Sequence, residues 1–228
     1  VRQRDGLRNV LKNNQTQEVI VATLENGVRF CMYPEGRHRP AHSLQTLGKG
    51  TFRAALAANA KFGDKMPVYI VPTGIEYGDY FRYRSTSLVT FGKPINVTEF
   101  VKSQNVENEV QLIEPLRKEL AARMSELITY IKDDEHLYEK WALTKMLAVD
   151  KGLMYGNFGT SLHDGMLANR EIVADIEKTC DEHPEVMEGI FGKIEKFEKK
   201  RKKKGISIYS FRKKNNALNI IGKTLAAL

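Results

Sequence analysis

Residues 35–39 carry the side chains of this chain that are best suited to chemistry. Glu35 is a carboxylate, Arg37 and Arg39 are guanidiniums, His38 is an imidazole, and Gly36 has no side chain. Arginine forks bind phosphate oxygens in a bidentate manner, and a glycine lets the backbone approach a ligand closely. This combination predicts a binding site for a phosphate ester; a plain basic surface loop is the alternative.

The residues before this cluster indicate the element that positions it. Asn26-Gly27 is typical of a turn, and residues 28–33 are largely apolar or aromatic, which predicts a short buried strand. Pro34 would end the hydrogen-bond ladder of that strand because proline has no N–H. Open α/β sheets bind ligands at the carboxyl ends of their strands, so we expect residues 35–39 at such an edge.

Four segments resemble motifs of one enzyme family, the glycerolipid acyltransferases. Residues 33–36, Tyr-Pro-Glu-Gly, are similar to the family's Phe-Pro-Glu-Gly-Thr-Arg signature. Residues 47–55, Leu-Gly-Lys-Gly-Thr-Phe-Arg-Ala-Ala, resemble the run that opens its next helix. Residues 68–75, Val-Tyr-Ile-Val-Pro-Thr-Gly-Ile, resemble its Val-Pro-Val-Gly-Ile strand, and residues 91–95 match its Phe-Gly-x-Pro-Ile ending. The segments follow one another in the family's order.

The resemblance implies an enzyme of phospholipid biosynthesis at the cytoplasmic face of a membrane. Members of the family transfer a fatty acyl group from acyl-CoA or acyl-carrier protein to glycerol phosphate or lysophosphatidate. The implied partners are a lysophospholipid acceptor, an acyl donor as co-substrate, and an anionic membrane surface. Neither a metal nor a further cofactor is expected.

The family's catalytic base has no counterpart in this sequence. In the family, a His-x-x-x-x-Asp pair upstream of the Pro-Glu-Gly block takes the proton from the acceptor hydroxyl. None of the five histidines here has an aspartate five positions later. We therefore expect a chain truncated before that pair, which binds the acceptor but contains no catalytic residue. A non-catalytic phospholipid-binding module is the alternative, and His38 as a substitute base is a weaker one.

The resemblance also suggests roles for single residues. The family's Thr-Arg is replaced by Arg37-His38, so the phosphate can be bound by Arg37, by Arg39, or in part by His38, with Arg39 preferred. Glu35 is expected to hold the loop backbone or an arginine. A family strand upstream ends in an arginine that helps to hold the phosphate. The predicted substrate-binding residues are Glu35, Gly36, Arg37, His38, Arg39 and, for that upstream arginine, Arg2 or Arg4.

The positive charge of the chain is concentrated near its C-terminal end. The net charge is +8, and residues 196–214 alone hold ten Lys or Arg against one Glu. A nearly neutral body with one basic segment argues against a nucleic-acid-binding protein and favours a local anionic partner. Polybasic segments beside apolar residues bind anionic bilayers. The predicted membrane-binding residues are Lys199, Lys200, Arg201, Lys202, Lys203 and Lys204; a nucleic-acid-binding tail is the weaker alternative.

Hydrophobic periodicity predicts the remaining elements and the fold class. Helices are expected over residues 13–25, 50–62, 113–131, 139–149 and 167–179 and from Pro184 onward, and an apolar strand over 66–75. Alternating helices and strands predict an α/β fold with a partial mixed, mostly parallel sheet flanked by helices, followed by a helical C-terminal region. The predicted domains are the C-terminal part of an acyltransferase α/β domain (1–108), a helical region (109–198) and a basic, membrane-proximal segment (199–228).

Overall fold

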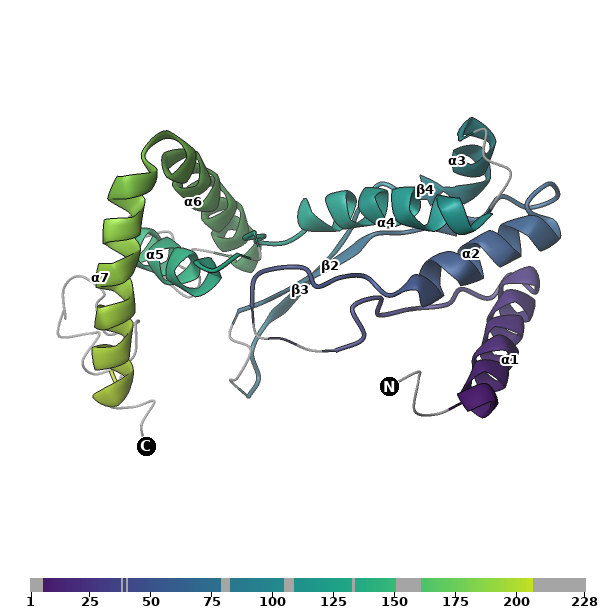
Figure 1. The fold of residues 1–228 in the computed structure, drawn as a ribbon, viewed down its shortest axis with the longest axis horizontal. Helices are drawn as coiled ribbons and strands as arrows, with labels where there is room; N and C mark the ends of the chain where they lie inside the picture. The colour runs from purple at the N-terminus through teal and green to yellow at the C-terminus, as the bar shows by residue number, and fades with distance from the viewer. Residues whose placement is uncertain are drawn as a thin grey trace. The chain divides into compact units, whose positions relative to one another are not determined.

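A computed structural model describes residues 6–37, 39, 41–78, 83–104, 109–132, 134–150 and 161–206 (Figure 1). The chain divides into two compact units. The first unit comprises Val1–Pro40, Leu44–Ile75 and Val89–Leu127, and the second comprises Ala41–Ser43, Glu76–Leu88 and Ile128–Leu228. Each unit has its own buried core.

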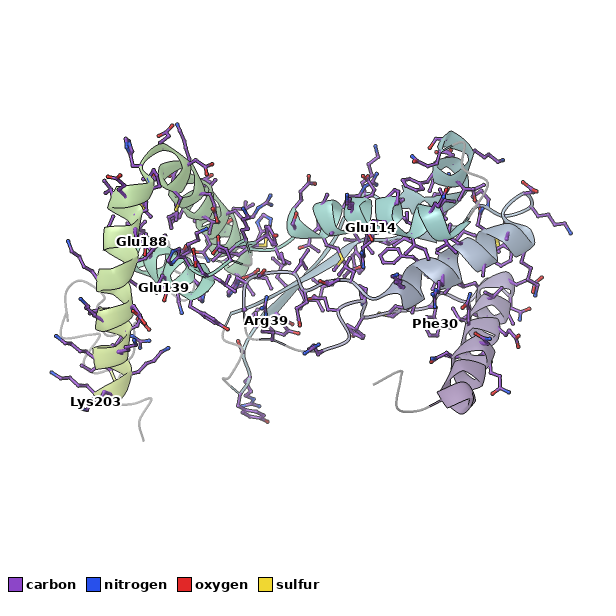
Figure 2. The ribbon with its side chains drawn as sticks, viewed as in Figure 1. Phe30, Arg39, Glu114, Glu139, Glu188 and Lys203 are labelled. Carbon is purple, nitrogen blue, oxygen red and sulfur yellow. The ribbon has the colours of Figure 1, made fainter. Side chains whose placement is uncertain are left out.

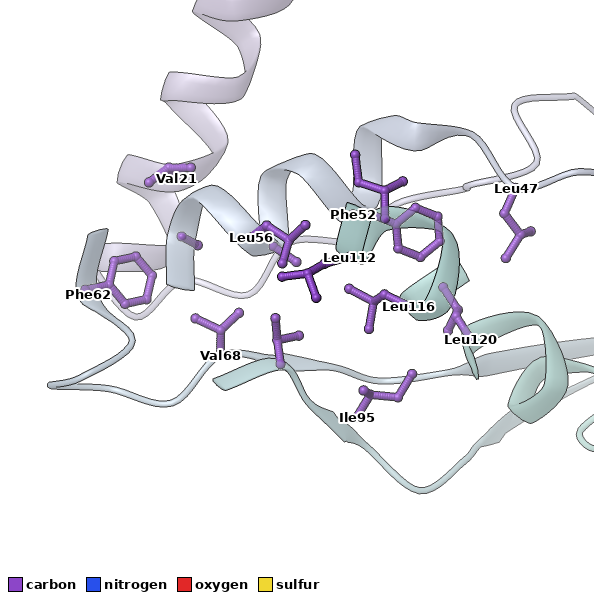
Figure 3. Close-up of a cluster of buried hydrophobic side chains, with 14 residues drawn as sticks. Val21, Leu47, Phe52, Leu56, Phe62, Val68, Ile95, Leu112, Leu116 and Leu120 are labelled. Carbon is purple, nitrogen blue, oxygen red and sulfur yellow. The ribbon is translucent and has the colours of Figure 1, made fainter. Parts of the chain in front are cut away.

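The first unit is built around a helix rich in alanine. Its helices are α1 (Gly6–Glu25), α2 (Lys49–Phe62), α3 (Val97–Ser103) and α4 (Glu109–Ser125). The small side chains of α2 let α1 and α4 pack closely against it. Its core is shown in Figure 3, where Phe52 of α2 and Leu116 of α4 are fully buried. The α1 helix ends as predicted at a glycine, Gly27, with a φ of 75°.

The strands of the structure are short and antiparallel. They are β1 (Tyr69–Ile70), β2 (Thr73–Tyr77), β3 (Ser87–Phe91) and β4 (Ile95–Asn96). β1 pairs with β4, with Ile70 opposite Ile95, and β2 pairs with β3. Between the two pairs, the carbonyl of Pro72 accepts a hydrogen bond from the N–H of Gly92 at 2.9 Å. This hydrogen bond joins the two strand pairs end to end, and the two pairs together are called the ribbon.

The register of this ribbon changes by one residue after Gly92. Pro72 is opposite Gly92, whereas Ile70 is opposite Ile95, so the second side of the ribbon holds one extra residue. This is a β-bulge. Arg123 of α4 covers it from outside the ribbon, because its guanidinium Nη1 donates to the carbonyls of Lys93 and Pro94 at 2.9 Å each.

The predicted α/β fold with a mostly parallel sheet is wrong. Among the described residues, helices dominate, and the strands form only two antiparallel pairs. Residues 28–33 are not a strand: they are extended coil without a ladder, and Val28, Phe30 and Tyr33 are all exposed. A short apolar run forms a strand only if another strand pairs with it, and none of the described strands pairs with residues 28–33. Helices flank residues 28–33 as predicted, but the described residues contain neither the first predicted strand nor the parallel sheet.

Two further expectations about this unit also fail. The predicted strand over residues 66–75 is interrupted at Pro72, and Tyr69, Val71 and Ile75 are exposed on one side. That strand is therefore not covered on both faces. Pro115 lies inside α4 and not in its first turn, because α4 begins earlier than its apolar periodicity indicates.

The second unit contains three helices that pack on one another (Figure 1). They are α5 (Leu137–Asp150), α6 (Leu162–Glu182) and α7 (Pro184–Lys203), close to the predicted ranges. Ser161 caps α6 by accepting from the N–H of Asp164, and Pro184 occupies the first turn of α7, where a missing N–H costs nothing. Their shared core includes Ile172, Ile176, Met187, Phe191 and Ile194.

Candidate functional site

The Tyr-Pro-Glu-Gly block forms a tight turn in the first unit. The N–H of Gly36 donates to the carbonyl of Tyr33 at 3.1 Å, which closes a four-residue turn with Pro34 in its second position. Proline favours that position because its φ is already fixed near the required value. Gly36 has a φ of 69°, a left-handed conformation that glycine adopts without strain. The proline and the glycine are therefore both explained by the turn itself.

Hydrogen bonds across the loop hold this turn in place. The Glu35 carboxylate accepts from the N–H of Gln45 at 2.9 Å, and the Gln45 side-chain amide donates to the carbonyl of Arg37 at 3.1 Å. The N–H of Gly48 donates to the carbonyl of Pro34 at 2.6 Å. Glu35 thus binds the loop backbone. Gln45, which supplies two of these contacts, was not indicated by the sequence analysis.

The predicted phosphate-binding arginines differ in their exposure. The side chain of Arg37 is exposed, and among the described residues it has no carboxylate partner. Arg39 is half-buried (Figure 2). His38, Arg2 and Arg4 lie outside the described residues. Of the two described arginines that are predicted to bind phosphate, Arg37 is therefore the one whose side chain is exposed to solvent.

The start of α2 lies directly beside this turn. Gly48 precedes the helix, its N–H binds Pro34, and a Cβ at this position would be 3.1 Å from the carbonyl oxygen of Pro34. Lys49, the first helical residue, is exposed, and the first turn of α2 contains no acidic residue. Arg117 of α4 donates to the carbonyl of Leu47 at 3.4 Å and so fixes the approach to the helix. The turn thus faces the positive end of a helix dipole.

No family model, curated protein or solved structure matched the chain. The resemblance to acyltransferase motifs accordingly comes from the residues of the chain themselves. Within the first unit, however, the four motif segments are joined in pairs. Gly48 binds Pro34, and Gly92 binds Pro72. Residues 33–36 are thus bonded to residues 47–55, and residues 68–75 to residues 91–95.

A pair of a half-buried histidine and a buried carboxylate in the second unit was not found from the sequence. His42 Nδ1 lies 3.5 Å from an oxygen of Glu76, whose other oxygen accepts from the N–H of Thr129 at 3.0 Å. The His42 ring contacts Trp141, with 3.7 Å between ring centroids. Burial lowers the pKa of His42 to about 4, helped by the ammonium of Lys145. Burial also raises the pKa of Glu76, against the effect of the Thr129 hydrogen bond.

The arrangement around His42 explains its presence without catalysis. The carbonyl of His42 accepts from the N–H of Ile131 at 2.6 Å. The pair therefore links three segments that are far apart in the sequence: residues 41–43, strand β2 and residues 128–131. No local pattern marks such a pair, because only the fold brings its members together.

The predicted membrane-binding residues lie at the C-terminal end of α7. Lys199, Lys200, Lys202, Lys203 and Lys204 are exposed. Arg201 differs from them: its side chain is only 15% exposed, and its guanidinium is bound by Glu198 at 2.6 Å. In the part of the chain that the structure describes, no helix combines the length and hydrophobicity that crossing a membrane requires.

Proposed function

We propose that this chain is part of a glycerophospholipid acyltransferase, and that the loop of residues 33–48 binds the phosphate of a lysophosphatidate-like acceptor. The observation that carries the proposal is the hydrogen bond from the Gly48 N–H to the Pro34 carbonyl. It joins the Tyr-Pro-Glu-Gly turn to the start of α2, two segments that resemble acyltransferase motifs independently of each other.

The local electrostatics favour an anionic ligand at this loop. The N-terminus of α2 supplies a partial positive charge and N–H groups, and helix N-termini of this kind bind phosphate. Lys49 and the exposed guanidinium of Arg37 add full positive charges. The only carboxylate of the turn, Glu35, is already bound by the N–H of Gln45. The repulsion that a carboxylate exerts on a phosphate is therefore reduced.

The proposed reaction is the transfer of an acyl group from a thioester to a hydroxyl. The acceptor hydroxyl oxygen attacks the thioester carbonyl, the carbon–sulfur bond breaks, and the hydroxyl proton passes to a general base. Since the chain contains no His-x-x-x-x-Asp pair, we assign the loop to binding and orienting the acceptor. A positioned acceptor lowers the entropic cost of the reaction.

The proposal is tested by measuring acceptor binding calorimetrically with a short-chain lysophosphatidate. Loss of a charge-assisted hydrogen bond costs about 1.5–3 kcal/mol, so Arg37→Ala should weaken binding roughly 10- to 100-fold. Arg53→Ala is the matched control because Arg53 is also an exposed arginine of the first unit. A monoacylglycerol without phosphate should bind equally to both variants.

Acyl transfer by the intact protein completes the test. Transfer from acyl-CoA or acyl-carrier protein to a panel of lysophospholipids should be reduced by Arg37→Ala, Arg39→Ala and Glu35→Ala. Phosphate-dependent binding without any transfer by the intact protein would instead identify a non-catalytic phospholipid-binding module. Wild-type binding in all three variants would refute the assignment of the loop.

A further inference from the structure

The lysines of α7 form a continuous face that is longer than the basic run in the sequence. At 100° per residue, Lys193, Lys196, Lys200 and Lys203 lie within about 80° of one another around the helix axis. All four are exposed. Over these eleven positions an α-helix rises about 15 Å. Two of the four, Lys193 and Lys196, precede the run of basic residues at 199–204.

The opposite side of α7 is the side that packs into the unit. Met187, Phe191 and Ile194 are buried there, against α5 and α6. Glu198 and Arg201 lie on that side too, and they neutralise each other at 2.6 Å. The packing of the core therefore directs the lysine face toward solvent.

The lysine face is also open and nearly free of acidic groups. Gly189 and Gly192 lie on the same side, and no described atom comes within 4 Å of a Cβ placed at either position. Glu195 lies at the flank, where it binds Lys199 at 2.5 Å, and Glu188 binds His136, which directly precedes α5. Figure 2 shows Lys203 at the end of α7, with side chains projecting from the helix.

We propose that α7 lies flat on an anionic lipid bilayer through this face, with Lys193, Lys196, Lys200 and Lys203 as the contacts. The face carries charge, and the exposed apolar side chains of Val186 and Phe197 lie only at its edge, which suits adsorption to a charged headgroup layer and not insertion into hydrocarbon. The inference does not depend on acyltransferase activity. It removes Arg201 and Lys202, which lie off the face, from the membrane-binding residues that the sequence predicts and adds Lys193 and Lys196.

Vesicle co-sedimentation of the full chain tests this proposal. Each lysine near an anionic surface contributes roughly a fivefold factor in binding, so Lys193→Ala/Lys196→Ala/Lys200→Ala should weaken binding to phosphatidylserine-containing vesicles roughly a hundredfold. The matched control is Lys132→Ala/Lys178→Ala/Lys202→Ala, which removes the same charge from exposed positions of the second unit off the face. That control should bind within about twofold of wild type in the same salt.

Three results would overturn the inference. The first is equal loss in both triple variants, since binding would then follow net charge alone. The second is unchanged binding in the variant of the face. The third is binding to duplex RNA that is tighter than binding to vesicles and equally sensitive to salt, that is weakened in the face variant, and that vesicles do not displace. This result would identify a nucleic acid as the partner. Circular dichroism of both variants checks that α7 remains folded.

Discussion

The guanidinium Nη1 of Arg123 lies 2.9 Å from the carbonyl oxygen of Pro94, and the same nitrogen also binds the carbonyl of Lys93. Both carbonyls belong to the β-bulge, where ladder partners are missing. Arg123→Met should therefore destabilise the first unit by about 1–3 kcal/mol, the cost of leaving polar groups without partners. Urea unfolding measures the effect. Glu119→Gln removes only the partly exposed ion pair with Arg123, at 2.6 Å, and should cost less than about 1 kcal/mol.

Substitutions at two glycines near the loop should have effects of opposite sign. Gly36 has a φ of 69°, so Gly36→Ala forces a side chain into the left-handed region at a cost of about 1–2 kcal/mol. Gly50 lies in the first turn of α2, where Gly50→Ala should be neutral or stabilising by up to about 1 kcal/mol. The free energy of unfolding and the affinity for lysophosphatidate are measured for both. Equal effects would contradict the role of the turn.

The stability of the second unit should depend on the titration of His42. The pKa of His42 is about 4 in the folded protein and 6.5 in its ordinary state, so the unfolded chain binds the proton first as the pH falls. Stability is lost across that window, by about 2 kcal/mol at pH 5 relative to pH 8. Glu76 has the opposite effect: because its pKa is raised in the folded protein, its contribution to the stability of the unit falls as the pH rises.

A variant separates the two titrations. His42→Gln keeps Glu76 but removes the histidine, so the stability advantage of wild type over this variant should shrink by about 2 kcal/mol between pH 8 and pH 5. His163→Gln replaces a histidine that is 55% exposed and serves as the control. If the advantage of wild type over His42→Gln is the same at both pH values, burial does not set the pKa of His42.

The ammonium of Lys140 should couple α5 to α6 more strongly than a surface ion pair does. Lys140 is 6% exposed and lies 2.6 Å from Asp134 and 2.9 Å from Glu177. Burial opposes its charge, yet these carboxylates outweigh burial and raise the pKa of Lys140. A double-mutant cycle of Lys140→Met and Glu177→Gln should give a coupling energy of about 1–3 kcal/mol. The exposed pair Lys178 and Glu182, 3.8 Å apart, should give less than about 0.5 kcal/mol.

Most of the helices were predictable from the sequence because their signals are local, but α3 was not predicted and α1 begins at Gly6, before the predicted start at residue 13. Gly27 ends α1 and Pro184 starts α7, and both positions follow from backbone conformations that depend only on the residue itself. The strands were not predictable in the same way. An apolar run such as residues 28–33 has the same pattern whether or not another strand pairs with it, and pairing is decided elsewhere in the chain.

The candidate site shows the same division. The turn at Pro34 and Gly36 could be predicted from the sequence, since proline and glycine each have a specific conformational preference. The partners that fix it were not: Gln45, Gly48 and Arg117 are ordinary residues until the fold places them against the loop. The contact between His42 and Glu76 likewise depends on long-range packing that no spacing rule reports.

The extra residue in the ribbon decides which side chains reach the interior of the first unit. Inward positions on the second side of the ribbon are even-numbered up to Gly92, and yet Ile95, an odd-numbered residue, is only 2% exposed. A one-residue slip that removed the bulge without removing a residue would turn Ile95 toward water and put Pro94 in its place. Deleting Lys93 would instead restore simple alternation with Ile95 still facing inward, opposite Ile70. Position 93 therefore tolerates a change of side chain, which is exposed there, and a deletion at that position would cost the carbonyl that Arg123 binds but not the burial of Ile95.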